Sequence, residues 1–426
     1  MAELPEGQFS RAAVVGSTAL KLGLGQLRGK AKKTFAGDDA DSVQDALDEE
    51  TAEQLFEALV KLRGTAIKLA QMLGMESGLL PEKMRKELEK SWHQVPPLNR
   101  VLVRKVLKEE FNRTPKELFT EFDSEAFAAA SLGQVHRAVL DKESEVAVKI
   151  QYPGIHVAME SDIKLIRKIA VGLPNKKMTN LSIEEIHARL REELDYEMEA
   201  TRTQWFRENL CIEGVEVPEV FPERSTARVL TTRLLPGNHI DEWLKTNPSQ
   251  ATRNKAAQNL YECFVRSVRE LNCLHADPNP GNYLFRDDGS IGLVDFGCTR
   301  TLSQQFTSNL PGLLRAYCSG NGDDLLNAYA AVGMDFGNTG HETYEKYLKP
   351  FGEWLAKPFL QDEFDFSEHA DYTGSGRQQI QGLSKIKDME SIAEEFIYFD
   401  RTVYGICKLF ERLEAKVSMR KYWDLA

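Results

Sequence analysis

The sequence predicts an α+β fold in which a strand-rich segment precedes a mostly helical one. Runs typical of strands lie between residues 126 and 152 and again at 227–235. After residue 303, apolar residues recur at helical spacing, with a predicted loop near 362–376. At about 150 residues per domain, a length of 426 residues favours two or three structural units.

Charge and composition narrow the class of protein. The chain has 54 Lys and Arg against 65 Asp and Glu, a net charge of −11. Phosphate contacts need clustered cations, so we expect no nucleic-acid partner. The sequence contains no run of 18 apolar residues, so we expect no transmembrane helix. Its first residues do not resemble a secretion signal. The six cysteines form no C-x-x-C pair, which favours a reducing cytoplasm over a disulfide framework or structural zinc.

The amino-terminal segment is basic. Residues 1–35 carry six Lys and Arg, with leucines at regular intervals, and predict either an amphipathic helix on an anionic membrane or a frayed basic tail. An acidic linker follows. The next helix, beginning near residue 51, has a leucine stripe on one face and Lys68 and Gln71 on the other. By surface statistics alone, that second face is solvated.

The predicted elements of the middle of the chain alternate in type. A strand, a charged turn and a second strand are expected within 126–154, followed by one long charged helix. The remaining elements are a strand, a helix and a hairpin with an Asp-Gly turn. The ranges are 183–209 for the long helix, 227–235 for the strand, 254–274 for the second helix, and 283–285 with 291–294 for the hairpin.

The strongest chemical signal is a loop followed by a D-F-G triplet. The run from His275 to Asn282 reads HADPNPGN, and Asp295-Phe-Gly comes thirteen residues after Asn282. This is the order of a kinase catalytic loop, H-x-D-x-x-x-x-N, and its metal-binding triplet. The prolines keep the loop extended, so Asp277 faces an acceptor. Asn282 and Asp295 supply the hard oxygen ligands that Mg²⁺ prefers. The pattern predicts a protein-kinase-like, two-lobed fold that binds ATP and Mg²⁺.

A lysine upstream fits the same interpretation. Lys149 ends an Ala-Val-Lys run that matches the kinase strand whose lysine contacts the phosphates. Its carboxylate partner lies on the long charged helix, but periodicity does not choose among the candidates, which are Glu192, Glu193, Asp195, Glu197 and Glu199.

Two features of protein kinases are missing. The turn that covers the phosphates is Ala128-Ala129-Ala130-Ser131 instead of a glycine-rich loop, so methyl groups hold the backbone farther from phosphate, while amides and the Ser131 hydroxyl remain for nucleotide binding. No A-P-E or long activation segment follows Gly297. We therefore do not expect a docking platform for protein substrates.

Over residues 50–300 the chain resembles the UbiB/AarF family of atypical kinases. The shared motifs are KLAQ at 68–71, AAAS at 128–131, AVKIQYPG at 147–154, ELDY at 193–196, EA at 199–200, LTT at 230–232, HADPNPGN at 275–282 and DFG at 295–297. The family motif K-x-G-Q has Ala70 at its third position here, a small change within a helix.

The resemblance implies further roles for individual residues. Lys149 would bind nucleotide and pair with Glu199, and the strand at 230–234, with Thr231 and Thr232, would contact adenine. The helix with Lys68 and Gln71 would cover the site, where Glu193 and Asp195 also restrict access. The resemblance thus implies a regulatory, occluding role for Lys68, Gln71, Glu193 and Asp195.

The resemblance also implies an activity and a location. It favours a Mg²⁺-dependent ATPase that supports ubiquinone or other isoprenoid-lipid metabolism, in the cytoplasm and peripheral to the inner membrane. The lipid or quinone precursor and the membrane contact through residues 1–35 are its expected partners. Two alternatives stay open, a nucleotide-gated lipid- or partner-binding pseudokinase and a small-metabolite kinase. The expected domains are an extension (1–50), a helical extension (51–115), an amino-terminal lobe (116–236) and a mostly helical carboxy-terminal lobe (237–426).

Overall fold

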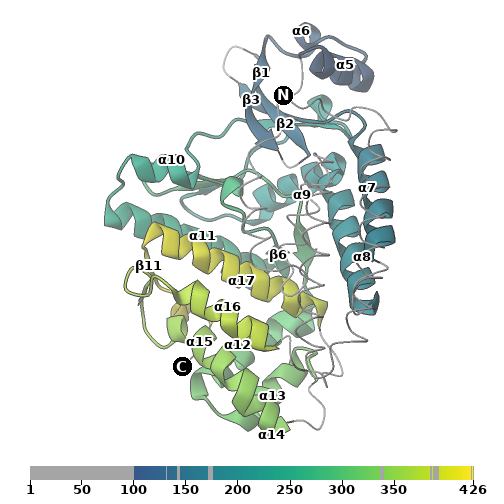
Figure 1. Cartoon of the computed structure of the whole chain (residues 1–426). Coiled ribbons are helices and arrows are strands. Elements are labelled where there is room, and N and C mark those ends of the chain that lie inside the picture. Colours follow the sequence, from purple (N-terminus) through teal and green to yellow (C-terminus); the bar gives the residue numbers. More distant parts are fainter. Residues whose placement is uncertain are drawn as a thin grey trace, which may run out of the picture. The chain divides into compact units, whose positions relative to one another are not determined.

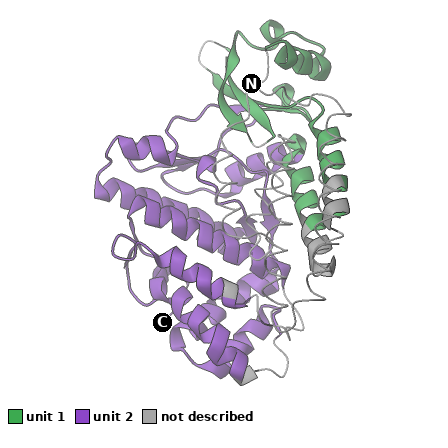
Figure 2. Ribbon diagram, in the orientation of Figure 1, with its two compact units in different colours: residues 1–197, 222–231 green, residues 198–221, 232–426 purple. Residues whose placement is uncertain are grey.

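The computed structural model describes most of the chain after residue 99 (Figure 1). The described residues are 100–130, 132–141, 144–170, 176–335, 340–383, 386, 393–423 and 425. They divide into two compact units that do not follow chain order (Figure 2). Unit 1 comprises 1–197 with 222–231, and unit 2 comprises 198–221 with 232–426. The predictions for residues 1–35 and for the helix with Lys68 and Gln71 lie outside the described residues, and the four-part domain scheme stays a prediction.

Unit 1 is built on a four-stranded sheet in the order β1-β2-β3-β5. Strands β1, β2 and β3 are antiparallel neighbours, and the end of β3 bonds to the segment before β5 through Gln151 N and Arg228 O at 3.1 Å. The elements are α5 (Arg100–Phe111), α6 (Pro115–Leu118), β1 (Glu121–Ala130), β2 (Gly133–Val139), β3 (Glu145–Gln151), α7 (Ile155–Ala170), α8 (Lys176–Glu193) and β5 (Val229–Arg233), which ends in unit 2.

The sequence interpretation of the first hairpin was wrong in one respect. Ala128, Ala129 and Ala130 form the end of β1, not a turn, and the chain reverses between Ala130 and Gly133. Ala130 therefore pairs directly with Gly133. A Cβ on Gly133 would lie 2.4 Å from the Ile150 carbonyl oxygen, so only glycine allows this approach of β2 to β3. Alanine has a low strand propensity, and its strand conformation here is set by the pairing with β2.

The expected single helix over 183–209 is instead two helices, α8 and α9 (Tyr196–Asn209). The break follows from a contact made by the sheet. The side chain of Gln151, at the end of β3, donates from Nε2 to the Leu194 carbonyl oxygen at 2.7 Å. In a continuous helix that carbonyl would accept from the amide four residues later. A side chain 43 residues away in sequence therefore ends α8.

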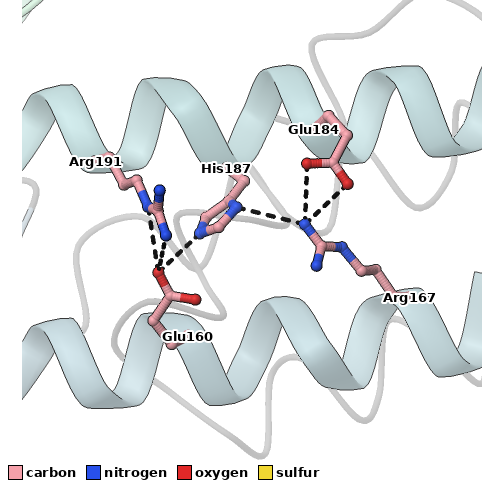
Figure 3. A network of polar contacts seen from close by, with 5 residues as sticks. All are labelled: Glu160, Arg167, Glu184, His187 and Arg191. Atoms are coloured by element: carbon pink, nitrogen blue, oxygen red, sulfur yellow. Dashed lines mark hydrogen bonds and ion pairs between the residues drawn. The ribbon is translucent and has the colours of Figure 1, made fainter.

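Helices α7 and α8 are joined by a chain of charged side chains (Figure 3). Glu160 on α7 accepts from Arg191 Nη2 at 2.8 Å and from His187 Nε2 at 3.0 Å, both on α8. Arg167 on α7 pairs with Glu184 on α8, at 2.8 Å. The hydrogen bonds from Arg191 and His187 lower the pKa of Glu160 from its usual 4.5 to about 2.

Unit 2 is mostly helical and contains one continuous hydrophobic core. Helix α17 packs along α11, and its buried face includes Phe399, Ile406 and Phe410. The helices are α9, α10 (Ile240–Lys245), α11 (Gln250–Leu271), α12 (Gln304–Ser319), α13 (Gly322–Ala331), α14 (Gly340–Thr343), α15 (Lys349–Ala356), α16 (Tyr372–Leu383) and α17 (Glu394–Leu413).

The strands of unit 2 are short and form three small sheets. They are β4 (Val215–Glu216), β6 (Cys273–His275), β7 (Tyr283–Phe285), β8 (Ile291–Leu293), β9 (Thr299–Thr301), β10 (Phe364–Asp365) and β11 (Lys416–Val417). The predicted hairpin is confirmed as β7 and β8, with Gly289 at φ +78° in its turn. The loop expected near 362–376 is wrong in part, because Phe364 and Phe366 are buried and α16 begins at Tyr372.

The α+β prediction is confirmed. None of the helices in the described part of the chain is both long and apolar enough to cross a bilayer.

Candidate functional site

Two pairs of strands bring the loop motif and the D-F-G triplet together in unit 2. The loop leaves β6 and enters β7, while the triplet leaves β8 and enters β9. Because β6 pairs with β9 and β7 with β8, both ends of each segment are fixed. Two further backbone bonds join them, from Ala276 N to Cys298 O at 2.9 Å and from Val294 N to Asn282 O at 3.0 Å. Asp295 therefore follows a residue that is bonded directly to Asn282.

Inside the loop, Asn282 is bonded to Asp277. Its Nδ2 donates to the Asp277 backbone oxygen at 3.0 Å and to Oδ2 at 2.9 Å. Asn279 closes the loop by accepting from Gly281 N at 2.9 Å. An amide carries its oxygen opposite its nitrogen, so Oδ1 of Asn282 is turned away from Asp277. That oxygen is of the class that Mg²⁺ prefers.

Asp295 is held by contacts on both sides of its peptide group. His275 Nε2 donates to the Asp295 backbone oxygen at 2.7 Å, so Nε2 carries the proton. Gly297 N donates to Asp295 Oδ1 at 3.0 Å. The buried Phe296 ring packs edge-on against His275, with ring centroids 5.4 Å apart. The Asp295 carboxylate and the Asn282 amide oxygen are both of the donor type that suits a divalent cation, and the Val294 amide bonded to Asn282 O joins their two segments.

The surroundings of the loop are apolar. Burial raises the pKa of Tyr283, and the negative charge of Asp277 raises it further. Burial also raises the pKa of the Cys273 thiol to about 11. Both groups are therefore neutral near pH 7.

Helix α9 contributes the carboxylate of Glu199, which is 1% exposed. One turn further along, Arg202 Nη1 donates to the Gly297 backbone oxygen at 2.7 Å and fastens the helix to the D-F-G segment. A Cβ on Gly297 would lie 3.9 Å from Glu199 Oε2 and 3.3 Å from Asp295 Oδ1. Glycine at 297 thus leaves room for the Asp295 carboxylate, whereas a Cβ would be in ordinary contact with Glu199. Sequence reasoning missed Arg202, because no motif of the catalytic loop includes it.

The predicted nucleotide-binding residues belong mainly to unit 1. Lys149 lies on β3 opposite Val135, and its Nζ is 5.0 Å from the centroid of the Tyr196 ring, a cation–π geometry. Glu199 belongs to unit 2, so its pairing with Lys149 stays a prediction. Tyr196 is a further neighbour of Lys149 that spacing could not have identified.

The other predicted site residues divide in the same way. Glu193 ends α8 and Asp195 follows the break, with its amide bonded to Glu192 O at 3.0 Å. The Thr231 hydroxyl donates to Arg224 O at 2.6 Å, so its side chain is already engaged within unit 1. The roles of Ala128, Ala129, Ala130, Thr231 and Thr232 stay predictions, and Ser131, Lys68 and Gln71 lie outside the described residues.

Comparison with known families identifies the chain. Residues 90–329 match the model of the ABC1 atypical kinase-like domain, which is more than half of the sequence. The chain belongs to this family of atypical kinases. Its curated relatives include the mitochondrial atypical kinase COQ8B of Danio rerio, which is 30% identical over 98% of this chain and 68% of the relative. The mitochondrial atypical kinase COQ8 of Schizosaccharomyces pombe is also 30% identical, over 99% of this chain and 70% of the relative.

A solved structure supports the fold of this ABC1-family chain. Rv3197 of Mycobacterium tuberculosis, solved in complex with erythromycin, has a TM-score of 0.65 and 25% sequence identity. The match covers 90% of this chain and 97% of the other. The resemblance to the UbiB/AarF kinases and the kinase-like α+β fold predicted from the sequence are therefore confirmed.

Proposed function

We propose that this chain is a Mg²⁺-dependent ATPase of the atypical kinase type, which supports ubiquinone or other isoprenoid-lipid metabolism at a membrane surface. The observation that carries the proposal is the joined arrangement of Asp277, Asn282 and Asp295, with His275 and Gly297 holding Asp295. Family membership supports an atypical kinase, and the mitochondrial COQ8 relatives support the link to quinone metabolism.

In this proposal each residue has a stated task. Asn282 Oδ1 and the Asp295 carboxylate would hold Mg²⁺, which would neutralise the negative charge of the phosphates. Lys149 binds the phosphates, and Glu199 orients it. Asp277 orients the attacking water or hydroxyl. The hydrogen bond from Asn282 Nδ2 fixes its carboxylate for this role. Thr231 and Thr232 would contact adenine, and the alanine strand end and Ser131 would contact the phosphates.

The short connection after Gly297 favours small acceptors or water over proteins. Strand β9 begins at Thr299, and α12 begins at Gln304 with Ser303 as its cap, whose Oγ accepts from Phe306 N at 3.2 Å. A protein kinase uses a long segment here to dock its substrate. In the proposal, residues 1–35 supply the membrane contact, and Lys68, Gln71, Glu193 and Asp195 restrict access to the site.

The first prediction concerns Asp295. Replacing it with Asn removes one negative charge from the proposed metal site, so we expect ATP turnover, measured with anionic liposomes, to fall at least about 100-fold. Asp288→Asn is the matched control. Asp288 lies in the turn of the same hairpin, where it accepts from Ser290, and its replacement should leave turnover unchanged.

Three outcomes separate the alternatives. Equal turnover in wild type and Asp295→Asn contradicts the catalytic proposal. The nucleotide-gated binding protein is favoured if MgATP raises the melting temperature of both wild type and Asp277→Asn while neither hydrolyses ATP. If MgATP does not raise the melting temperature of the wild-type chain at all, the nucleotide site itself is wrong.

A further inference from the structure

Helix α17 approaches the catalytic loop so closely that a side chain cannot fit between them. Gly405 lies within α17, and Pro278 directly follows Asp277 in the loop. A Cβ built on Gly405 would lie 2.2 Å from Pro278 Cγ and 2.8 Å from Pro278 Cβ. Carbon atoms that are not bonded pack at roughly 3.5–4 Å, so any residue other than glycine would have to move the loop or the helix.

The backbone gives no separate reason for glycine here. Gly405 is in a helix interior, where glycine is a poor helix former, and it is not among the described glycines with positive φ. The close contact with Pro278 is therefore the structural reason for glycine at position 405.

The same helix also holds the segment that follows D-F-G. The Arg300 guanidinium on β9 lies 4.7 Å from the centroid of the Tyr398 ring. Glu395, in the first turn of α17, accepts from the backbone amide of Ser303. These contacts come about two and three turns before Gly405. One face of α17 thus touches both segments of the proposed site, and all of these residues belong to unit 2.

The helix cannot move away easily, because its other face is in the core. Ile406, Cys407 and Phe410 are at most 5% exposed. Close-packed interiors resist displacement more than exposed loops do. An added methyl group at residue 405 would therefore push Pro278, by roughly 1 Å given the normal contact distance. Pro278 is joined directly to Asp277, whose backbone oxygen and carboxylate both accept from Asn282.

We propose that Gly405 is a positioning residue of the phosphotransfer site, which lets α17 support Pro278 and so fixes Asp277 against Asn282. The expected effect on turnover rests on the proposed function. The expected effect on the position of Asp277 rests on geometry alone. A displacement of about 1 Å in a catalytic group can lower a rate about 100-fold.

The test compares two glycines in helices of unit 2. Gly405→Ala meets Pro278, whereas Gly312→Ala in α12 meets nothing, since no atom lies within 4 Å of a Cβ built there. Both variants replace a helical glycine with the best helix former. We expect Gly405→Ala to lower kcat for ATP hydrolysis at least about 10-fold with KM changed less than about threefold, and Gly312→Ala to change neither.

A second measurement does not depend on activity. The amides of Asn282 and Val294 are bonded to Asn279 O and Asn282 O, both within the site. Hydrogen exchange at these two amides should be faster in Gly405→Ala than in wild type or Gly312→Ala. If the wild type has no turnover, the proposed function fails, but the exchange result still decides whether Gly405 positions the loop.

Rescue separates positioning from a general loss of stability. Pro278→Ala removes Cγ, the atom nearest to residue 405, so the double variant should recover part of the turnover and exchange protection that Gly405→Ala loses. If Gly405→Ala does not fold, recovery of folding in the double variant supports the contact. Wild-type exchange in Gly405→Ala, or a double variant no better than Gly405→Ala, would overturn the proposal.

Discussion

At the scale of single residues, Asp400 on α17 has an unusual environment. Burial raises the pKa of its carboxyl from 3.8 to about 7, and no charge among the described residues offsets this shift. Tyr317, Tyr329 and Cys407 share its surroundings and have raised pKa values, so they remain neutral across the same pH range. The charged form of Asp400 is therefore a cost to the folded state.

A prediction about stability and pH follows from the buried Asp400 carboxyl. Between about pH 4 and 7 the folded chain keeps a proton that the unfolded chain has released, so stability falls as pH rises through this window. Asp400→Asn removes the cost. We expect it to raise the free energy of unfolding by roughly 2–4 kcal/mol at pH 8 and to have little effect at pH 4.

Urea unfolding at several pH values measures this effect. The exposed Asp287, replaced by Asn, is the control and should show no such dependence on pH. A stability gain for Asp400→Asn that is the same at pH 4 and pH 8 would show that burial of the charge is not its cause.

At the scale of elements, the packing of α7 on α8 depends on Glu160. Its folded pKa of about 2 lies below the usual 4.5, so its contribution to stability is complete above pH 4.5 and is lost as the pH falls toward 2. Its side chain is 37% exposed, so solvent screens the interaction. We expect Glu160→Gln to cost about 0.5–1 kcal/mol at pH 7 in low salt.

Thermal unfolding at different pH and salt concentrations checks this prediction. The stability cost of Glu160→Gln should shrink in 0.5 M salt, where the Debye length is roughly a few ångströms. It should also shrink below pH 4.5. Glu145→Gln, an exposed change on β3 of the same unit, should be neutral under all conditions. A cost for Glu160→Gln that does not change with salt or pH would point to packing of the side chain and not to its charge.

The sequence predicted those elements whose contacts are local. The hairpin β7–β8 was correctly predicted, since its turn residues and spacing define it. The expectation that the loop from His275 to Asn282 is extended was wrong in part, because Pro280–Asn282 form a 3-10 turn that Asn279 caps. The break between α8 and α9 was not predicted, because it depends on Gln151 from the sheet. The contact of Pro278 with Gly405 joins residues 127 positions apart, and neither residue carries a pattern that points to the other.

At the scale of the whole molecule, the carboxy-terminal residues complete the core of unit 2. The Trp423 side chain is 1% exposed, and its Nε1 donates to the Tyr261 hydroxyl on α11 at 2.5 Å. The Arg269 guanidinium, on the same helix, lies 5.7 Å from the Trp423 ring centroid. This end of the chain is therefore part of the packing that holds α11 against α17.

The whole-molecule prediction compares two tryptophans. Trp423→Ala should lower the free energy of unfolding by about 3–5 kcal/mol, the range for a large buried aromatic side chain. Trp205→Ala on α9, where the side chain is 38% exposed, should cost about 1 kcal/mol or less. Chemical denaturation followed by circular dichroism gives both values. Similar costs for the two variants would show that the chain end is not part of the cooperative core.

The bond from Gln151 to the Leu194 carbonyl oxygen has a consequence for the orientation of Glu199. An uninterrupted helix turns 100° with each added residue, so any insertion before Glu199 would swing its carboxylate to another side. Ending α8 at the sheet and starting α9 afresh at Tyr196 resets that rotation. A change in the length of α8 would therefore not by itself rotate the Glu199 carboxylate about the axis of α9.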